Sequence, residues 1–318
     1  MAKRKIRKKH LNTSTVVAIV LVAILMLAGI VGCFYEPIMD LFSGSSSGTG
    51  GDSDSDYDSS PDSDSSVKVH FIDVGQADCA VICTDNGNII IDAGMNASED
   101  EMKAYIDKLG IKSFRYAIFT HPHEDHIGGA EVIMKNYRVD NVIIPNLEAT
   151  TKVYEAMLDS IEESGASVKV IEAGDTFDFS VGSLKAKILG PVEIDDEPND
   201  ASIITKITYG KTDLLFMGDA ETHSEELLLR KYIMGELRAD IIKLGHHGSN
   251  TSSSPEFLRA VSPNVAIISC GLDNKYGHPH SETLDTLEDQ KIQYYRTDMQ
   301  GSVICTITPD GYTFKTTK

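Results

Sequence analysis

The sequence has no tryptophan and only five cysteines. Without tryptophan, an aromatic cage or a sugar-stacking platform would have to be built from tyrosine. No two cysteines are spaced as CxxC, so a cysteine zinc site is not expected. Cys79 and Cys83 fall on one expected strand about 13 Å apart, too far for a disulfide. We therefore expect the cysteines of the folded part to be buried free thiols.

Basic residues are also scarce where a polyanion would need them. None stands between positions 11 and 66, and six of the 29 lie in the first nine positions. Residues 67–318 hold 23 basic and 40 acidic residues, a net charge of −17. Non-specific affinity for nucleic acid comes largely from Lys and Arg on phosphates, so this acidic body is a poor non-specific binder. A polyanionic substrate would have to be held locally, by metal ions or a small basic patch.

The N-terminal part divides into segments of different composition. Residues 1–14 form a basic tail, and residues 15–35 form an apolar run long enough to span a bilayer as a helix. Because basic residues mark the cytoplasmic side, the pattern predicts a single-pass signal anchor in the cell membrane, with the rest of the chain extracellular. The alternative anchor is a lipidated Cys33, although the sequence stays apolar beyond it. Residues 43–66, rich in Ser, Asp and Gly, predict a flexible linker.

Residues 67–318 alternate between strand and helix patterns and predict one domain. Strands are expected at Val67–Val74, Ala80–Thr84, Ile89–Asp92, Arg115–Thr120, Val142–Ile144, Leu184–Leu189, Ile203–Tyr209, Asp213–Met217, Asp240–Leu244 and Val265–Ser269, with closing strands up to Lys315. Helices are expected at Ser98–Leu109 (Ser98 as N-cap), Ile127–Tyr137, Val153–Ser164, Glu221–Tyr232 and Ser281–Gln290, with a short one after Pro255. Two similar halves of strands and helices predict a four-layer α/β sandwich, with two sheets inside and helices outside.

The strongest chemical signal is Thr120-His121-Pro122-His123-Glu124-Asp125-His126-Ile127-Gly128-Gly129. Three of the ten histidines of the chain stand within six positions, which makes an ordinary solvated loop a poor explanation. His121 and His123 are two residues apart, so in an extended loop both imidazoles can face one way. Asp125 and His126 then face a second point. Imidazole together with carboxylate suits zinc, and also iron or manganese.

Three further segments place polar residues after predicted strands. Asp219 follows an apolar strand, where a carboxylate can bridge two cations, although a lone Asp there usually caps the next helix. His246 and His247 follow another strand at its carboxyl end. His278 lies in a turn that would, taken alone, be a surface loop.

Together these motifs resemble the signature of the metallo-β-lactamase superfamily. Their order is similar to the metallo-β-lactamase-like domain of the DNA-uptake competence protein ComEC, and also to bacterial phosphodiesterases such as phosphorylcholine esterase. The resemblance covers nearly all of residues 67–318. The motifs that carry it are Phe71-Ile72-Asp73-Val74-Gly75-Gln76-Ala77-Asp78, Ile91-Asp92-Ala93-Gly94, the histidine motif, Asn199-Asp200-Ala201-Ser202, Gly218-Asp219, Leu244-Gly245-His246-His247-Gly248-Ser249 and Tyr276-Gly277-His278-Pro279.

The resemblance implies an αββα sandwich that holds two metal ions, with zinc expected and manganese as the alternative. The implied ligands are His121 and His123 for one ion and Asp125, His126 and His246 for the other, with Asp219 between them. His247 could take the place of His246, because the sequence does not choose between neighbours. Many members of the superfamily have a further histidine before the bridging aspartate, whereas residues 127–218 contain none. Completion of the first ion by water, and a form with a single ion, therefore stay open.

The expected reaction is metal-assisted hydrolysis of a phosphodiester, with DNA as the favoured substrate. Asp125 and Asp219 would act at the ions. His278, or whichever of His246 and His247 is not a ligand, would protonate the leaving alkoxide, so His278 and His247 are included as catalytic candidates.

Asp92 and Asp78 are candidates to orient the ligand imidazoles, with turn-capping carboxylates as the alternative. Two other functions also fit the sequence: esterase action on a cell-envelope phosphodiester, and a binding domain that keeps the fold without turnover. With one apolar span, the chain is not expected to form a multi-span channel, and no protein partner follows from the sequence.

Overall fold

The computed structural model describes residues 66–194, 197–233 and 235–318. The predicted basic tail, membrane span and linker lie outside these residues. Within the described ranges, no helix has both the length and the apolar character needed to cross a membrane.

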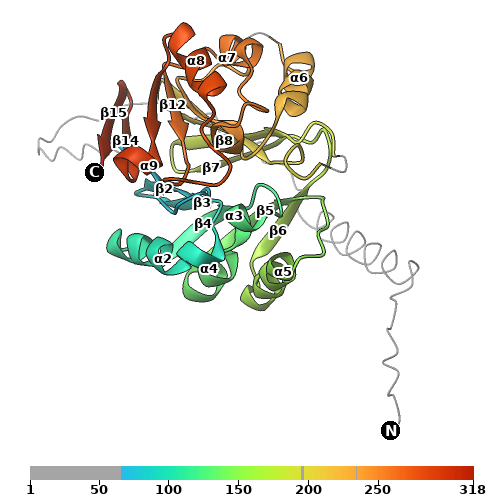
Figure 1. The fold of residues 1–318 in the computed structure, drawn as a ribbon. Helices are drawn as coiled ribbons and strands as arrows, with labels where there is room; N and C mark the ends of the chain where they lie inside the picture. Colours follow the sequence, from blue (N-terminus) through green and yellow to red (C-terminus); the bar gives the residue numbers. More distant parts are fainter. Residues whose placement is uncertain (1–65, 195–196, 234) are drawn as a thin grey trace, which may run out of the picture. The chain divides into compact units, whose positions relative to one another are not determined.

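Two β-sheets lie face to face (Figure 1). The first has eight strands in the order β15-β14-β1-β2-β3-β4-β5-β6, and the second has seven in the order β13-β12-β11-β10-β9-β8-β7. The first sheet comprises β1 (Val67–Phe71), β2 (Ala80–Thr84), β3 (Gly87–Ile91), β4 (Ser113–Ile118), β5 (Arg138–Pro145), β6 (Ser167–Ile171), β14 (Val303–Thr308) and β15 (Gly311–Thr316). The second comprises β7 (Phe177–Val181), β8 (Leu184–Gly190), β9 (Ile204–Tyr209), β10 (Thr212–Phe216), β11 (Ile241–Lys243), β12 (Val265–Ile268) and β13 (Gln293–Arg296).

The sheets are held together by the apolar residues that alternate along their strands. On β1, Val67, Val69 and Phe71 are buried in the core between the sheets. Phe71 stacks on Phe216 of β10, with ring centroids 5.8 Å apart. This period-two pattern is what predicted the strands, because side chains two apart share one face of a sheet.

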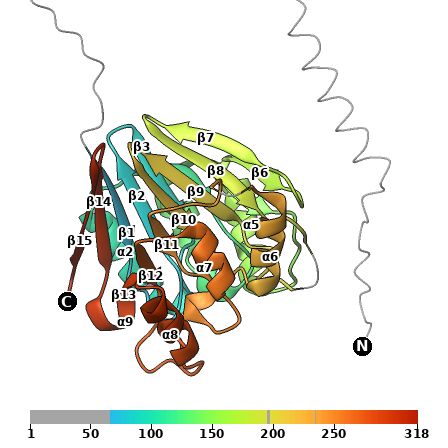
Figure 2. The same ribbon diagram turned by 90° about the horizontal axis from the view of Figure 1, so that it is seen from above.

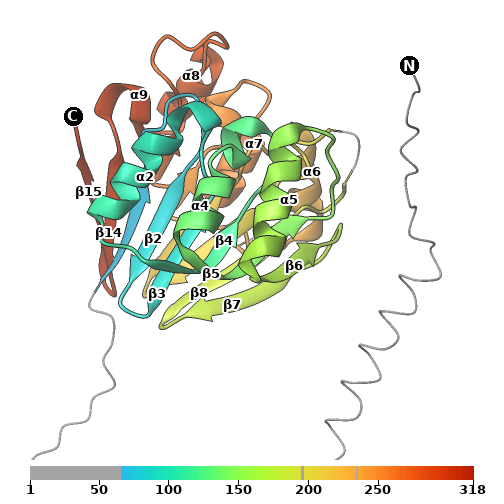
Figure 3. The same cartoon turned by 90° about the horizontal axis from the view of Figure 1, so that it is seen from below.

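Helices cover the outer face of each sheet (Figures 2 and 3). The first sheet is covered by α2 (Glu99–Lys108), α4 (Ala130–Asn136) and α5 (Lys152–Ser164), and the second by α6 (Thr222–Lys231), α7 (Pro255–Val261) and α8 (Ser281–Asp289). The short helices α3 (Glu124–Ile127) and α9 (Thr297–Gln300) and the 3-10 turns η2 (Asn96–Ser98) and η3 (Gly245–Gly248) lie in connections. A separate apolar cluster lies under each helix layer. The predicted four-layer sandwich is confirmed.

The predicted helix Ile127–Tyr137 is wrong in its extent. It is two helices, α3 and α4, separated by Gly128 and Gly129. Both glycines press against the backbone of the preceding loop. A Cβ on Gly128 would lie 2.3 Å from Asn96 N, and one on Gly129 would lie 2.4 Å from Ala93 O. Only glycine fits at these two positions, and the close packing that results places the histidine loop directly against the end of β3.

Two local features also differ from expectation. Ser98 is the N-cap residue of α2, as predicted, but its side chain makes no capping bond; its hydroxyl instead donates to Met95 O at 3.1 Å. The edge strands β6 and β7 were not predicted, and four of the five β6 residues are exposed, so no apolar alternation marks that strand. The expectation of free thiols is confirmed for the four cysteines of the described domain, of which Cys83 is half-buried and the others are buried.

Candidate metal centre

Loops that follow four strands meet at one edge of the sandwich. β4 leads into the histidine motif, β10 into Asp219, β11 into η3, and β12 into the loop that carries His278. Because β10, β11 and β12 are parallel neighbours, their carboxyl ends open at the same edge. The backbone N–H of Ile203 donates to Thr120 O at 2.9 Å, which ties the second half of the domain to the end of β4 beside the site.

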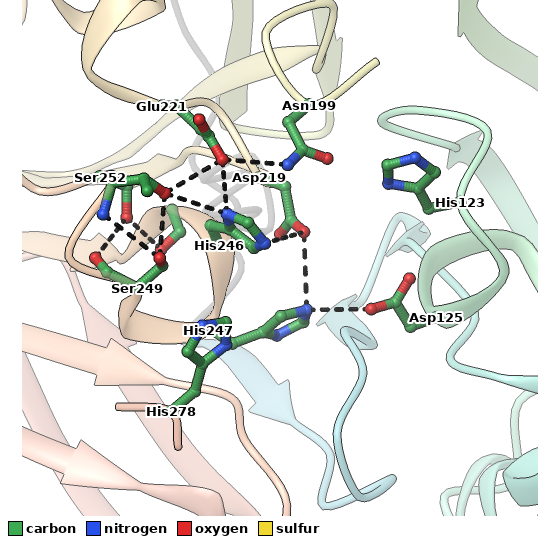
Figure 4. A network of polar contacts seen from close by, with 12 residues as sticks. His123, Asp125, Asn199, Asp219, Glu221, His246, His247, Ser249, Ser252 and His278 are labelled. Carbon is green, nitrogen blue, oxygen red and sulfur yellow. Dashed lines mark hydrogen bonds and ion pairs between the residues drawn. The ribbon is translucent and has the colours of Figure 1, made fainter. Parts of the chain in front are cut away.

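Asp125, His126, Asp219 and His247 each bring one ligand-type atom within 4.8 Å of the others. His247 Nε2 lies 3.3 Å from Asp125 Oδ2 and 3.6 Å from Asp219 Oδ2 (Figure 4). His126 Nε2 lies 3.2 Å from Asp219 Oδ1. A tetrahedral cation with bonds of about 2.0–2.2 Å spaces its ligand atoms about 3.3–3.6 Å apart. The quartet therefore fits a single cation such as zinc.

Buried polar atoms without partners also indicate a bound cation at this place. Within the described part of the chain, His126 Nε2 and Asp219 Oδ1 are buried and, apart from each other at 3.2 Å, have no hydrogen-bond partner. Leaving such a group unpaired costs about 1–3 kcal/mol, and more when it is charged. A divalent cation between these atoms would remove that cost, so the donor set and its burial both fit a metal.

Asp219 reaches the quartet because of the turn after β10. Gly218 has φ +56, and a Cβ there would lie 2.9 Å from the Ser202 side chain, so only glycine makes this turn without strain. The backbone N–H of Asp219 donates to Ser202 Oγ at 3.0 Å. The N-cap of α6 is Glu221. The alternative role of Asp219 as a helix cap is thus wrong.

A buried carboxylate orients His126. His126 Nδ1 is 2.8 Å from Asp92 Oδ2, and Asp92 also accepts bonds of 2.8 Å from the backbone N–H and the hydroxyl of Thr120. This arrangement turns Nε2 of His126 toward the quartet. It is the orienting role expected of Asp92, since a ligand imidazole is usually fixed through its second nitrogen.

A buried ion pair supports His247. Its Nδ1 lies 2.9 Å from Ser269 O and 3.3 Å from Asp78 Oδ1, and Asp78 Oδ2 lies 2.5 Å from Lys243 Nζ. Burial would raise the pKa of Asp78, but Lys243 and His247 outweigh it and lower that pKa to about 2. Asp78 is therefore an anion beside His247, in the orienting position expected from the sequence.

The predicted ligands of the first ion lie outside the cluster of four ligand atoms: His121 faces Asp219 from the other direction, and His123 lies beside His121. His121 Nε2 is 3.0 Å from His123 Nδ1 and 3.9 Å from Asp219 Oδ2. His121 is buried and its Nδ1 is near two hydroxyls, Thr120 Oγ1 at 3.2 Å and Ser202 Oγ at 3.3 Å, whereas His123 is exposed. We call His121 and His123 the open side of the centre, and Asp125, His126 and His247 the closed side; Asp219 lies between them.

The structure distinguishes His246 from His247. Both have positive φ, 47° and 53°, within η3. That left-handed backbone costs about 1–3 kcal/mol for each non-glycine residue and typically persists at functional sites. It sends His247 into the quartet, while His246 Nδ1 lies 2.8 Å from Glu221 Oε1 and Nε2 lies 4.0 Å from Asp219 Oδ2. Of the two neighbours left open by the sequence, geometry brings His247 and not His246 among the four ligand atoms.

The centre opens into a cavity of about 740 Å³. Its lining includes His123, Asp125, Asn199, Asp219, His246 and His278. His278 Nδ1 lies 3.3 Å from Gln76 Nε2, and its ring centroid is 5.3 Å from that of His246. Burial, followed by the charges of His247 and His246, lowers the pKa of His278 to about 4. A neutral ring near pH 7 is a weak proton donor, which counts against His278 in that role.

The two sides of the centre also differ in protonation. Burial alone would lower the pKa of His126 and His247, but Asp219 and further carboxylates outweigh it. The pKa of His126 is raised well above its usual value, and that of His247 is raised to about 10. Burial and the charge on His126 instead hold the pKa of His121 well below its usual value. Without a cation, the closed side therefore carries protons and His121 does not.

Two contributors were not assigned a role from the sequence. Glu221 was read only as the start of a helix, yet it accepts from Thr251 Oγ1 at 3.0 Å and holds His246. Lys243 is 4% exposed and neutralises Asp78. The sequence did contain a sign of this role: Lys243 ends an otherwise apolar strand, Ile241-Ile242-Lys243. Lysine is almost never buried unless it is paired, so a buried carboxylate partner could have been predicted.

A two-sheet sandwich with histidine and carboxylate ligands at the carboxyl ends of its strands is the architecture of a metal-dependent hydrolase. The chain belongs to the Metallo-beta-lactamase superfamily, whose family model matches residues 72–272. This confirms the resemblance drawn from the order of the motifs.

The relatives also confirm the similarity to competence proteins. The chain is 29% identical over 258 residues to ComE operon protein 3 of Bacillus subtilis (strain 168), covering 75% of this chain and 33% of that protein. It is 31% identical over 235 residues to competence protein ComA of Neisseria gonorrhoeae, covering 73% and 31%. The chain thus spans about a third of the length of these curated relatives. Among solved structures, it is similar to the metallo-beta-lactamase fold protein YhfI from Bacillus subtilis, with 10% identity, a TM-score of 0.43 and coverage of 72% and 95%.

Proposed function

We propose that this chain is a metal-dependent phosphodiesterase whose substrate is DNA, anchored in the cell membrane through residues 15–35 with its hydrolase domain outside. The observation that carries the proposal is the convergence of Asp125, His126, Asp219 and His247 beside a cavity of about 740 Å³. The names of the competence relatives support DNA as the substrate, although the match covers only part of each. Two zinc ions are proposed, with manganese as the alternative.

Divalent cations at such a centre supply a nucleophile from water near neutral pH and neutralise charge on phosphate oxygens. The chain holds the ligand atoms for this chemistry in place before substrate arrives. Asp92 orients His126, and Ser269 O with Asp78 orients His247. Asp219 contributes to both sides, so its loss should affect every step that depends on the centre.

His246 is the proposed proton donor to the leaving alkoxide. Its Nδ1 lies 2.8 Å from Glu221 Oε1, which orients the ring. Its Nε2 lies 4.0 Å from Asp219 Oδ2, and His246 is part of the cavity lining. Histidine is the side chain most often used for general acid catalysis.

Charge at the cavity fits local capture of a phosphate chain. Lys275 is the one Lys or Arg in the lining formed by the described residues. The domain around it is strongly acidic, with 40 acidic against 23 basic residues in 67–318. Binding of a polyanion would therefore depend on the cations and Lys275, as expected from the composition.

The test uses the full chain with zinc or manganese and a panel of single- and double-stranded DNA, RNA, bis-nitrophenyl phosphate and phosphorylcholine esters. We expect cleavage of DNA that Asp219→Ala abolishes and Glu124→Ala preserves. Glu124 lines the same cavity but is exposed, and it accepts from Asn96 N at 3.1 Å, so it is a matched acidic control. Intact cells carrying the chain should cleave DNA added to the medium.

Equal activity in the two variants would remove Asp219 from the mechanism. Cleavage of phosphorylcholine esters without cleavage of DNA would instead favour the envelope phosphodiesterase. A chain that binds no metal would support the non-catalytic binding domain.

A further inference from the structure

The side-chain amide of Asn199 has one end satisfied and one end unsatisfied. Its Nδ2 donates to Glu221 Oε1 at 3.2 Å. Within the described residues, its Oδ1 is buried and has no hydrogen-bond partner. In Figure 4 this oxygen points away from Glu221, toward the part of the site where His123 lies. Asn199 and His123 line the same cavity.

The orientation of this amide is determined by its neighbour. A carboxylate accepts hydrogen bonds and cannot donate them, so only the NH2 end of Asn199 can face Glu221. Glu221 stays ionised because the hydrogen bond from His246 lowers its pKa, with further help from Asn199 and Thr251 after the cost of burial. Flipping the amide would place two oxygens against each other. The unpaired oxygen is therefore held on the cavity side.

The backbone around Asn199 is fixed as well. The Asp200 carboxylate accepts the backbone N–H of Glu221 at 2.9 Å and that of Ser224 at 3.3 Å. These bonds anchor residue 200 on the first turn of α6. Asn199 thus presents its oxygen from a braced segment, which is what a ligand of a preorganised site requires.

The open side is the part of the centre that lacks donors. His121 Nε2 lies 3.0 Å from His123 Nδ1 and 3.9 Å from Asp219 Oδ2, but neither histidine belongs to the cluster of four ligand atoms. Residues 127–218 hold no histidine that could add a donor. We propose that Asn199 Oδ1 is a further protein ligand of the cation on the open side. With this oxygen the open side would have two imidazole and two oxygen donors, the same kinds of donor that the closed side has, and such a set suits zinc or manganese.

This inference rests on the metal centre of the proposed function but not on its substrate. Its test is equilibrium dialysis of the full chain against Mn²⁺ and against Zn²⁺, with bound metal counted and the affinity of the weaker ion measured. Asn199→Ala should weaken that ion at least about tenfold and leave the tighter ion unchanged. Asn199→Asp, which keeps an oxygen at the same place, should retain it.

Asn146→Ala is the matched control. Asn146 is an exposed asparagine that likewise donates to a glutamate, Glu172 at 2.7 Å, outside the cavity lining. The Asn146→Ala variant should bind both ions with the affinities of the wild type. Asn199→His should raise the affinity of the weaker site for zinc relative to manganese by about tenfold or more, because an imidazole replaces an amide oxygen.

The rival explanation is that Asn199 only supports Glu221. In that case Asn199→Asp, which loses the NH2 donor and adds a repelling charge, would bind metal as poorly as Asn199→Ala. That result would overturn the proposal, and so would unchanged affinity of the weaker ion in Asn199→Ala. Metal binding that depends on Asn199 in a chain that cleaves no phosphodiester would contradict the proposed function alone.

Discussion

The closed and open sides of the metal centre share Asp219 but are built differently. On the closed side, the second nitrogen of each imidazole is fixed: Asp92 holds His126, and Ser269 O with Asp78 holds His247. On the open side, His121 Nδ1 faces only hydroxyl groups and His123 is exposed. Ligands with fixed partners lose little freedom when a cation binds, so the closed side should bind first and hold its ion more tightly.

The two sides also differ in where their supports come from. On the open side, His123 is exposed, and His121 is near one hydroxyl of its own loop, that of Thr120, and one from a distant segment, that of Ser202. The closed side draws its supports from residues far apart in sequence, from Asp78 to Ser269. A short motif can thus supply ligand atoms, whereas orienting them requires the assembled fold. The difference between the sides is therefore a difference in tertiary support.

The largest difference in metal affinity is expected when one proposed ligand is removed from each side in turn. His126→Ala should weaken the tighter ion about 100-fold, because a structural zinc site worth about 10–16 kcal/mol divides over about four ligands. His123→Ala should affect only the weaker ion. The measurement is metal affinity by competition with a chelator, with circular dichroism to confirm that both variants fold.

Equivalent losses in His126→Ala and His123→Ala would show that both sides contribute alike. In that event the extra hydrogen bonds of the closed side would have no bearing on affinity.

A smaller effect is expected from the supports. Asp92→Asn keeps the shape but weakens the bond to His126, and should lower the affinity of the tighter ion about 10- to 100-fold. Asn also tolerates the positive φ of Asp92, 57°. On the open side, Ser202→Ala removes a hydroxyl that lies 3.3 Å from His121 Nδ1 and also accepts the backbone N–H of Asp219. It should lower the affinity of the weaker ion about fivefold or somewhat more, the loss of neutral hydrogen bonds. A larger loss of metal affinity in Ser202→Ala than in Asp92→Asn would contradict the conclusion that the closed side binds its ion more tightly.

The layers of the fold were predictable because they depend on local patterns. Alternating apolar residues marked β1, and the spacing of His121, His123 and Asp125 marked a metal loop. Edge strand β6 could not be found this way, since its side chains are mostly exposed and its position depends on pairing with β5. Strand pairing is a long-range property that no local period encodes.

The choice between His246 and His247 shows the same limit at the scale of one residue. Adjacent histidines have the same local signal, and their roles separate only through the left-handed turn in η3 and through Glu221 and Asp78. Asn199 is a similar case, because its unpaired oxygen becomes visible only once Glu221 has fixed the amide. Sequence spacing therefore predicted the residues near the centre more reliably than their individual tasks.

The smallest expected difference between the two sides is in the pH dependence of their metal affinities. In the metal-free chain, Asp219 and the neighbouring carboxylates raise the pKa of His126 and raise that of His247 to about 10, against the effect of burial. Both rings are then protonated near neutral pH, and a cation must displace their protons. The affinity of the tighter ion should therefore rise with pH, by up to about tenfold per displaced proton for each pH unit between about pH 6 and 8. Because burial holds the pKa of His121 well below its usual value, that ring has no proton to lose, and the weaker ion should show a shallower slope. Chelator competition at several pH values measures both slopes, and a steeper slope for the weaker ion would contradict the assignment of the proton-bearing histidines to the closed side.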